Sequence, residues 1–327
     1  MGYKVWVSEF LPPLGTQKEF LETVAEVIVG GVKNYTEKEL IGIVQDVDGV
    51  LVTAKAPMTR PVIFAGEKLR VIGKYGVGVE SIDLDAATSK GIPVTYTPGV
   101  NQDTVAEFTI GLILAVTRNI PFAMESLRRG GDWRNEKFLG MEMKKATLGI
   151  AGLGRIGSCI ANKIRSFEVS LIAYDPYVSQ EKADALGVKL VGLDTLLRTA
   201  DIVSLNLPLT PETFHLIGEE ELRCMKPTGF LINTGRGSII EESALYHALK
   251  EGWIAGAGLD VFEKEPPDIN NPLLSLENVV VTPHMGGSSL GARVRLVNTA
   301  VENVVKVLKG EIPEIQNIAN PQILKKP

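Results

Sequence analysis

Short apolar runs alternate with amphipathic stretches along the first hundred residues of the chain. Runs of β-branched and other apolar residues predict strands at residues 4–7, 27–29, 49–53, 69–73 and 93–95. Apolar positions at helical spacing predict helices between them, as at residues 16–25 and 37–44. This alternation is typical of βαβ units, whose parallel strands form a buried sheet.

The pattern changes at residue 101, where a run rich in Ala, Leu and Ile predicts one long helix through residue 118. A second alternation follows, with strands predicted at residues 147–151, 169–174, 202–206, 230–233, 256–260 and 279–282. A last helix is expected at residues 290–309. Six strands at this spacing predict a doubly wound parallel sheet.

The two alternations predict an α/β protein with two Rossmann-like or flavodoxin-like domains, each a parallel sheet flanked by helices. Because chain ends often return to the first domain, we expect a discontinuous substrate domain of residues 1–101 and 291–327. Residues 102–290 would then form the cofactor domain. A length of 327 residues agrees with two domains, each with its own core.

Charge and cysteine content narrow the class of protein. The formal charge is −5, with acidic and basic residues interspersed, so neither nucleic acid nor an anionic membrane is an expected partner. The two cysteines, Cys159 and Cys224, have no partner at metal-ligand spacing, and we expect reduced, buried thiols and no metal site. No run approaches the roughly 20 apolar residues of a membrane span, and a cytoplasmic protein is expected.

A glycine-rich turn carries the first chemical signal. Gly152, Gly154 and Gly157 stand directly after the strand at residues 147–151 and before a helical pattern. In this context the glycines allow a tight turn, close approach of a pyrophosphate and close packing of helix on strand. Asp175 ends the next strand, where a carboxylate would bind the adenosine ribose and repel a 2′-phosphate. The combination predicts a dinucleotide site that prefers NAD to NADP.

Three further strand ends carry side chains suited to ketone reduction. Arg236, Asp260, Glu265 and His284 all follow predicted parallel strands, whose carboxyl ends share one edge of the sheet. Hydride transfer to a keto acid needs a cation for the carboxylate, a proton donor for the new alkoxide, and a group that keeps the donor charged. Arg236, His284 and Glu265 match these roles. The other two histidines, His215 and His247, are expected to be structural.

At this point the sequence resembles a known family. The motifs are the glycine turn with Asp175, the stretch Leu205 to Thr213, the Asn233 to Gly237 turn, the stretch Leu259 to Pro266, and Thr282-Pro283-His284. Together they resemble the D-isomer-specific 2-hydroxyacid dehydrogenases over nearly the whole chain. The resemblance implies a catalytic set of Arg236, Glu265 and His284, and a nicotinamide carboxamide held by Asp260. It extends the cofactor-binding set to Arg155, Ile156, Pro208, Thr234, Gly235, Gly286 and Gly287.

Within that family, residues 73–84 and 97–101 look most like 3-phosphoglycerate dehydrogenases, enzymes of serine biosynthesis, in a short form without a C-terminal regulatory domain. The resemblance implies that the backbone N–H groups of Val77 and Gly78 bind the substrate carboxylate, although the same residues also suit a simple glycine turn. Lys74 stands where a cation often accompanies a phosphorylated substrate, but a loop lysine is commonly just solvated. A homodimer formed through the cofactor domain is also implied.

Several functions remain open from the sequence. A glyoxylate, hydroxypyruvate or D-lactate reductase would use the same residues, and a similar Arg, Glu and His set supports phosphite oxidation in a related dehydrogenase. Corepressor scaffolds that sense NAD share the fold and the three catalytic positions. The identity of the 2-hydroxy acid, the physiological direction and the oligomer size are not given by these patterns.

Overall fold

The structure is a computed structural model that describes residues 2–9, 17–131, 133–134 and 136–324. The chain divides into two compact units, one formed by Met1–Asn101 with Ser289–Pro327 and the other by Gln102–Ser288. The second boundary falls at residue 288, two residues before the position suggested by the sequence. Ser289 belongs with the last helix because its hydroxyl caps that helix, accepting a hydrogen bond from the Ala292 N–H at 3.1 Å.

The first unit is built on a parallel sheet with the strand order β2-β1-β3-β4-β5. The strands are β1 (Tyr3–Val7), β2 (Ala25–Val29), β3 (Gly49–Val52), β4 (Val71–Lys74) and β5 (Val94–Thr95). Each pair is parallel, with β1 between β2 and β3. The middle strands β3 and β4 are buried along their whole length, which explains their unbroken apolar runs.

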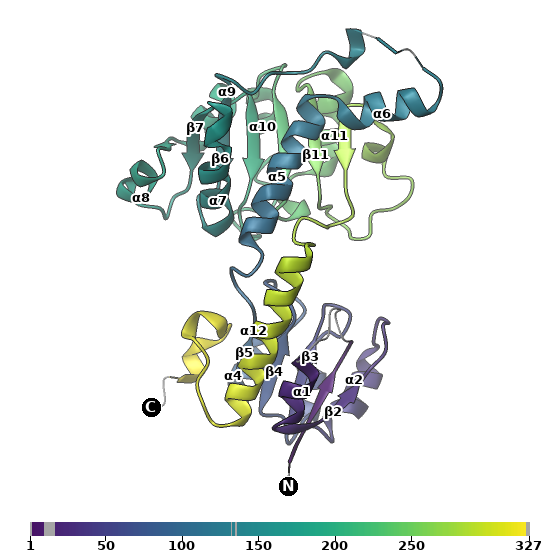
Figure 1. Ribbon diagram of the computed structural model, residues 1–327, viewed down its shortest axis with the longest axis vertical. Helices are drawn as coiled ribbons and strands as arrows, with labels where there is room; N and C mark the ends of the chain where they lie inside the picture. Colours follow the sequence, from purple (N-terminus) through teal and green to yellow (C-terminus); the bar gives the residue numbers. More distant parts are fainter. Residues whose placement is uncertain (1, 10–16, 132, 135, 325–327) are drawn as a thin grey trace. The chain divides into compact units, whose positions relative to one another are not determined.

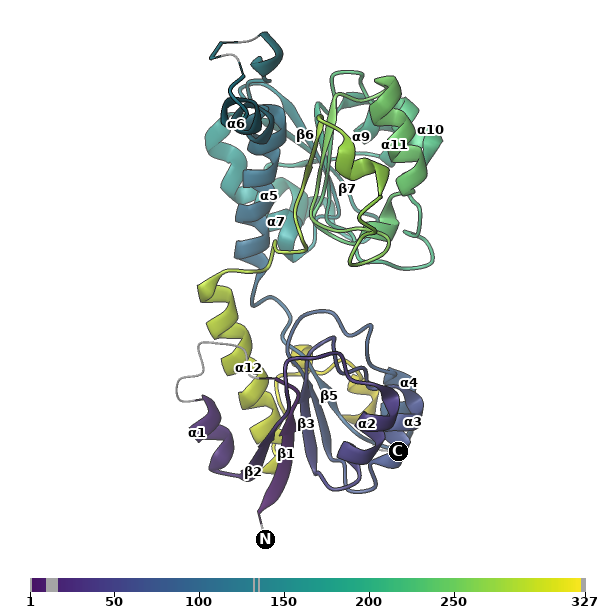
Figure 2. The same cartoon turned by 90° about the vertical axis from the view of Figure 1, so that its right-hand side faces the viewer.

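Helices cover both faces of this sheet. They are α1 (Gln17–Glu22), α2 (Glu37–Val44), α3 (Arg60–Ala65), α4 (Leu84–Ser89) and α12 (Leu290–Leu308), with two 3-10 turns, η5 (Ile315–Asn317) and η6 (Pro321–Leu324), after α12. Figure 2 shows α1 and α12 on one face and α2, α3 and α4 on the other. The return of the chain through α12 therefore completes the core of the unit that begins at the N-terminus.

The second unit contains a longer parallel sheet, with the strand order β12-β11-β10-β9-β6-β7-β8. The strands are β6 (Thr147–Ala151), β7 (Ser170–Tyr174), β8 (Lys189–Leu190), β9 (Ile202–Leu205), β10 (Phe230–Asn233), β11 (Gly256–Leu259) and β12 (Val279–Val281). The order reverses direction at β6, because the chain first moves to β7 and β8 and then returns to β9. Such a switch point is where open α/β sheets bind ligands.

The helices of the second unit also lie on both faces of the sheet. They are α5 (Gln102–Thr117), α6 (Ile120–Arg128), α7 (Arg155–Ile164), α8 (Gln180–Ala185), α9 (Leu193–Thr199), α10 (Glu219–Cys224) and α11 (Glu242–Glu251), with 3-10 turns η1 (Glu136–Phe138), η2 (Arg165–Phe167), η3 (Gly237–Ile239) and η4 (Pro272–Ser275). In Figures 1 and 2, α5 and α7 cover one face while α9, α10 and α11 cover the other. Two apolar clusters, one on each face, hold these layers together.

Most predicted elements are present, and the fold class is confirmed. The strands expected at residues 147–151 and 230–233 have the bounds of β6 and β10. The predicted helix 16–25 is wrong at its end, because α1 stops at Glu22 and Ala25 already pairs with Tyr3 in the sheet; residue 16 lies outside the described residues. The strand predicted from residue 69 starts two residues later, since the Leu69 N–H closes a turn onto the Gly66 carbonyl.

Two further features differ from expectation. Both cysteines are free, as expected, but each is half-buried rather than buried, because Cys159 lies on α7 near Asp103 and Cys224 on α10 near Arg198. Within the described residues, no single helix is long and apolar enough to cross a membrane; α5 and α6 reach that length and hydropathy only as a pair bent by 60°.

Candidate active site

The residues singled out in the sequence follow the carboxyl ends of neighbouring strands in the second unit. Along the sheet, His284 follows β12, Asp260 follows β11, Arg236 follows β10, Pro208 follows β9 and Gly152 follows β6. All these strands are parallel, so their carboxyl ends share one edge. Residues spread over 133 positions of the sequence thus lie along one edge of the sheet, and the switch point is at β6.

The glycine turn has the geometry that its sequence predicts. Gly152 has a φ of 92°, which favours glycine, and a Cβ there would lie 2.7 Å from the Asn206 carbonyl oxygen. A Cβ at Gly157 would lie 2.1 Å from the Gly152 carbonyl oxygen, so only glycine lets α7 begin this close to β6. A Cβ on Gly154 would meet nothing within 4 Å. The turn is therefore open at its middle glycine, beside the N-terminus of α7.

Asp175 supports this turn directly. Its Oδ2 accepts a hydrogen bond from the Leu153 N–H at 2.8 Å, and its Oδ1 accepts one from the Tyr177 N–H at 2.9 Å. Each oxygen of a carboxylate has a second lone pair, so both can accept a further donor. The acid therefore lies beside the glycine turn, with acceptor capacity left for a ribose hydroxyl.

His284 and Glu265, predicted to act as an acid–base pair, are in contact although they are 19 positions apart in the sequence. The Nδ1 of His284 lies 2.5 Å from the Oε2 of Glu265, and the side chains are 53% and 37% exposed. The other carboxylate oxygen, Oε1, accepts a hydrogen bond from the Phe262 N–H at 3.2 Å. Since Glu265 occupies Nδ1, the Nε2 of His284 is the ring nitrogen available to a substrate. These residues line a pocket of about 330 Å³ together with Asp260, Phe262, Pro266, Pro267 and Pro283.

Asp260 holds the turn that carries His284. The aspartate is 2% exposed, and its Oδ1 accepts the Thr282 hydroxyl at 2.6 Å and the Met285 N–H at 2.8 Å. Its Oδ2 accepts the Gly286 N–H at 2.7 Å. His284 has a φ of 50°, a left-handed conformation that costs roughly 1–2 kcal/mol for a residue with a Cβ. The hydrogen bonds to Asp260 stabilise this turn.

Arg236 lies in a turn fixed by its neighbours. The Asn233 amide donates to the Arg236 carbonyl at 2.9 Å, while the Asn233 Oδ1 accepts the Gly235 N–H at 3.0 Å. The Thr234 hydroxyl lies 2.8 Å from that of Thr109, a fully buried residue on α5. Strand β10 is joined to the next strand end by the Asp260 N–H, which donates to the Asn233 carbonyl at 2.9 Å. Arg236 is half-buried as a residue, and its guanidinium donates to the Gly235 carbonyl at 2.9 Å.

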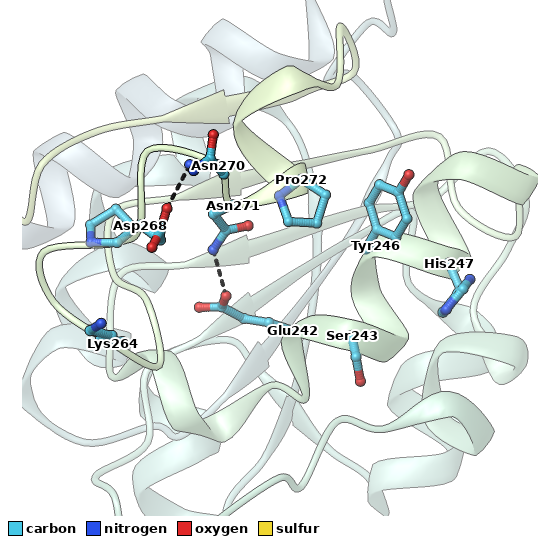
Figure 3. Close-up of a pocket in the computed structure, with 10 residues that line it drawn as sticks. Glu242, Ser243, Tyr246, His247, Lys264, Asp268, Asn270, Asn271 and Pro272 are labelled. Carbon is cyan, nitrogen blue, oxygen red and sulfur yellow. Dashed lines mark hydrogen bonds between the residues drawn. The ribbon is translucent and has the colours of Figure 1, made fainter.

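A second pocket lies next to the first, in the same unit. It has a volume of about 530 Å³ and is lined by α11 and the loop of residues 264–272. In Figure 3, Glu242 and Asn271 approach each other, with the Asn271 amide donating to Glu242 Oε2 at 2.8 Å. Pro267 lines both pockets. Glu242 thus ties α11 to the loop that follows Glu265.

Comparison with known proteins agrees with this geometry. A model of the D-isomer specific 2-hydroxyacid dehydrogenase NAD binding domain matches residues 110–286, more than half of the chain. The chain belongs to this family. It is 46% identical to D-3-phosphoglycerate dehydrogenase of Methanocaldococcus jannaschii over 92% of its length, and it spans 57% of that relative.

Other proteins match over nearly all of their own length. The chain is 44% identical to glyoxylate reductase of Thermofilum pendens over 98% of this chain and 96% of that protein. The structure of D-lactate dehydrogenase from Aquifex aeolicus, complexed with NAD and lactic acid, superposes with a TM-score of 0.84 at 29% identity, covering 97% of this chain and 98% of that one. The relatives therefore establish the family, but their names give different substrates.

The candidate cofactor site fits NAD. The glycine turn is open at Gly154, the first N–H groups of α7 follow it, and Asp175 stands beside it. A helix N-terminus offers unpaired N–H groups and a partial positive charge to a pyrophosphate. The same carboxylate would repel the 2′-phosphate of NADP. The domain that the family model identifies as NAD-binding thus has the groups that this cofactor requires.

Arg236 aside, the predicted substrate residues Lys74, Val77 and Gly78 lie in the first unit. Lys74 is the last residue of β4 and is only 4% exposed, so it is not a solvated loop lysine. Its ammonium donates to the Ser81 hydroxyl at 3.1 Å, and burial lowers the pKa of Lys74 to about 8. Val77 and Gly78 follow in the turn, with Val77 36% exposed. Substrate binding by these three residues stays a prediction.

One contact beside the candidate site is not indicated by any pattern in the sequence. His215, expected to be structural, places its Nε2 3.0 Å from the Oε1 of Glu263, two residues before the proposed acid–base partner. The pair spans 48 residues of sequence, and His215 lies in a loop well after β9 rather than at a strand end. His247 lies on α11 and takes part in no such pair.

Proposed function

We propose that this chain is an NAD-dependent oxidoreductase that transfers a hydride between the nicotinamide and C2 of a small D-2-hydroxy acid or 2-keto acid. The observation that carries the proposal is the pairing of His284 with Glu265 in a pocket at the sheet edge that also holds the glycine turn. Membership in the dehydrogenase family supports the reaction type.

The proposed chemistry follows from the charge that ketone reduction creates. When hydride reaches C2, the carbonyl oxygen becomes an alkoxide, and the protonated Nε2 of His284 donates a proton to it. Glu265, ionised and in contact with Nδ1, stabilises the imidazolium. In oxidation the neutral ring accepts the hydroxyl proton at the same nitrogen. NAD supplies the hydride acceptor when bound.

Two groups are proposed to bind the acid end of the substrate. The guanidinium of Arg236 offers a planar pair of donors that matches a carboxylate. In the first unit, Lys74 offers a buried cation, and the N–H groups of Val77 and Gly78 offer donors. The ammonium already donates to the Ser81 hydroxyl, and the Glu80 carboxylate opposes the effect of burial on its pKa, so a substrate anion would be a further partner of Lys74.

The first candidate substrate is 3-phosphoglycerate. The resemblance of residues 73–84 to 3-phosphoglycerate dehydrogenases and the identity to the Methanocaldococcus jannaschii enzyme support it. The second candidate is glyoxylate or hydroxypyruvate, and the match to the Thermofilum pendens glyoxylate reductase over nearly all of both chains favours it. A D-lactate reductase, a phosphite dehydrogenase and a scaffold that senses NAD are the remaining alternatives.

One set of assays separates these functions. NADH consumption is measured with glyoxylate, hydroxypyruvate, pyruvate and 3-phosphohydroxypyruvate, and NAD reduction with 3-phosphoglycerate and phosphite. The highest kcat/KM identifies the substrate, since specificity is a ratio of kcat/KM values. Turnover with phosphite alone, or tight NADH binding with no turnover on any acid, would contradict the proposal.

We also propose a cytoplasmic homodimer formed through the second unit. Helix α6 has no fully buried residue, and it presents Ile120, Met124 and Leu127 at 53%, 46% and 53% exposure. Trp133 and Leu139 follow, each 78% exposed. Apolar surface gathered in one segment is typical of a protein interface, and a second copy of the same segment would cover it symmetrically.

A further inference from the structure

We infer that His215 is a positioning residue of the active site, which acts through Glu263 to hold Glu265 in place against His284. The inference rests on the proposed function, in which Glu265 and His284 form the acid–base pair. His215 precedes α10, in a loop that carries none of the proposed catalytic residues.

The first observation is that His215 joins two segments of the site. Its backbone N–H donates to the Ser238 carbonyl at 2.8 Å, two residues after Arg236. Its ring Nε2 lies 3.0 Å from the Glu263 Oε1, two residues before Glu265. The distance is that of an ion pair, although the two atoms do not meet the geometry of a hydrogen bond, and Nε2 is inaccessible to solvent. One residue thus contacts the segments that carry the cation and the acid.

The second observation is the backbone conformation of His215. Its φ is 51°, in the left-handed region, and its ring stacks on Phe214 with centroids 4.0 Å apart and planes 17° from parallel. A residue with a Cβ is costly in this region, and such residues gather at functional sites. The stacked ring and the left-handed backbone together direct Nε2 toward Glu263.

The third observation is that Glu263 is held on its other side as well. Its N–H donates to the Glu242 Oε1 at 2.6 Å, and its Oε1 accepts the Glu242 N–H at 3.0 Å. The second oxygen of Glu242 accepts the Asn271 amide, as Figure 3 shows. Each carboxylate thus accepts the backbone N–H of the other residue, and the His215 ring lies against the same Oε1 of Glu263. Glu263 is therefore held between Glu242 and His215.

The position of Glu263 affects Glu265 through the backbone of Phe262, the residue before Glu263. The Phe262 N–H donates to the Glu265 Oε1, which leaves Oε2 directed at His284. Gly237 packs against the peptide that joins Phe262 to Glu263 so closely that a Cβ on it would lie 1.9 Å from the Phe262 carbonyl carbon. Residue Phe262 is therefore held through this peptide by Gly237 and, on its Glu263 side, by the His215–Glu263–Glu242 contacts. A shift of the Phe262 N–H would rotate the Glu265 carboxylate away from the ring.

The test compares His215→Asn with a matched His247→Asn in the full-length protein. Asparagine tolerates the left-handed backbone but is too short to reach Glu263. We expect His215→Asn to lower kcat roughly tenfold, because small displacements of catalytic groups have effects of that order, while the KM for NADH stays unchanged. His247→Asn should match the wild type. Adding Glu263→Gln to His215→Asn should lower kcat no further than the first change, because both remove one interaction.

A second readout does not depend on turnover. The proton between His284 Nδ1 and Glu265 Oε2 should give a downfield NMR resonance, which should move upfield or broaden in His215→Asn and stay in place in His247→Asn. A wild-type protein inactive on every 2-keto acid would contradict the proposed function, yet this resonance would still decide the role of His215. If His215→Asn lowers only the unfolding temperature, and kcat and the resonance equal those of the wild type, the inference is wrong.

Discussion

The Nδ1 of His284 lies 2.5 Å from the Oε2 of Glu265, and both residues follow strands at the same edge of one parallel sheet. This contact assigns the two ring nitrogens different tasks, because the carboxylate takes Nδ1 and leaves Nε2 for the substrate. Both carboxylate oxygens of Asp260 accept hydrogen bonds from the turn that carries His284. The following experiments test what this arrangement implies.

His284→Ala should lower kcat by roughly 10² or more, the scale of a positioned acid–base group. The KM for NADH should change little, because no contact of His284 with the glycine turn is present among the described residues. In the wild type, reduction needs the protonated ring and oxidation the neutral ring, so the pH optimum of reduction should lie below that of oxidation. Initial rates in both directions across the pH range check this. Near-normal turnover of His284→Ala at saturating substrate would remove the mechanism.

Arg236→Lys should mainly raise the KM for the keto acid, by roughly tenfold to a hundredfold, since a single ammonium cannot reproduce the two parallel hydrogen bonds of a guanidinium. The guanidinium also donates to the Gly235 carbonyl at 2.9 Å, but the turn should survive because Asn233 still bonds to the main chain at residues 235 and 236. Arg198→Lys, on the exposed surface of α9, is the matched control. An unchanged KM in Arg236→Lys would place the substrate carboxylate elsewhere.

Asp175→Ala should weaken NAD binding and reduce the discrimination against NADP, because the change removes a ribose acceptor and a repulsive charge together. The variant also loses the hydrogen bond to the Leu153 N–H, so some loss of stability is expected. Asp175→Asn separates the two effects, since it keeps an acceptor for Leu153 without the charge. Kinetics with NADH and NADPH measure the ratio, and a wild type that uses both equally would contradict the assignment.

The sequence predicts the buried strands of the sheet better than it predicts short or exposed elements. Strands such as β6 and β10 are apolar runs buried along nearly their whole length, so local hydrophobicity defines them. Strand β8 was missed because it has two residues, one of them an exposed lysine. Helix α6 was missed because no fully buried residue on it marks a core-facing stripe.

The same contrast holds within the candidate site. Residues that follow strands, such as His284 and Asp175, can be placed on one edge from the chain order alone. The contact between His215 and Glu263 cannot, because it depends on how two loops fold against each other. The burial of the cysteines is a similar case. Both stand in apolar segments, which predicts burial, but a helix in an apolar segment still has an outer face, and both thiols are half-buried.

The exposed surface of α6 predicts the oligomeric state. Leu127→Glu combined with Met124→Glu should convert a dimer to a monomer, because two charges on each copy would meet at the two-fold axis and be desolvated. Ile269→Glu is the control, since Ile269 is an apolar side chain of the same unit and is 86% exposed. Light scattering at several concentrations measures the mass. A dimer that persists in the double variant would place the interface elsewhere.

Lys74 should stabilise the bound substrate and destabilise the folded protein. Burial, partly opposed by the charge of Glu80, lowers its pKa from the ordinary 10.5 to about 8, so below pH 8 the lysine is charged in both the folded and the unfolded state, and folding carries the net cost of burying the charge. A difference of that size corresponds to roughly 3 kcal/mol. Between pH 8 and 10.5 the unfolded chain binds more protons than the folded one, and the stability of the wild type therefore rises with pH until the cost has disappeared.

Lys74→Met isolates this effect. At pH 7 the variant should have a higher free energy of unfolding than the wild type, by up to roughly 3 kcal/mol, and the difference should vanish as the pH rises from 8 to 10.5. Its KM for the acid substrate should rise, and more for 3-phosphoglycerate than for an unphosphorylated acid if Lys74 binds the phosphate. Urea unfolding at pH 7 and pH 10 measures the first effect and steady-state kinetics the second. Lys38→Met, on the exposed face of α2, should change neither, and equal stabilities of the wild type and Lys74→Met at pH 7 would show that burial of the ammonium carries no cost.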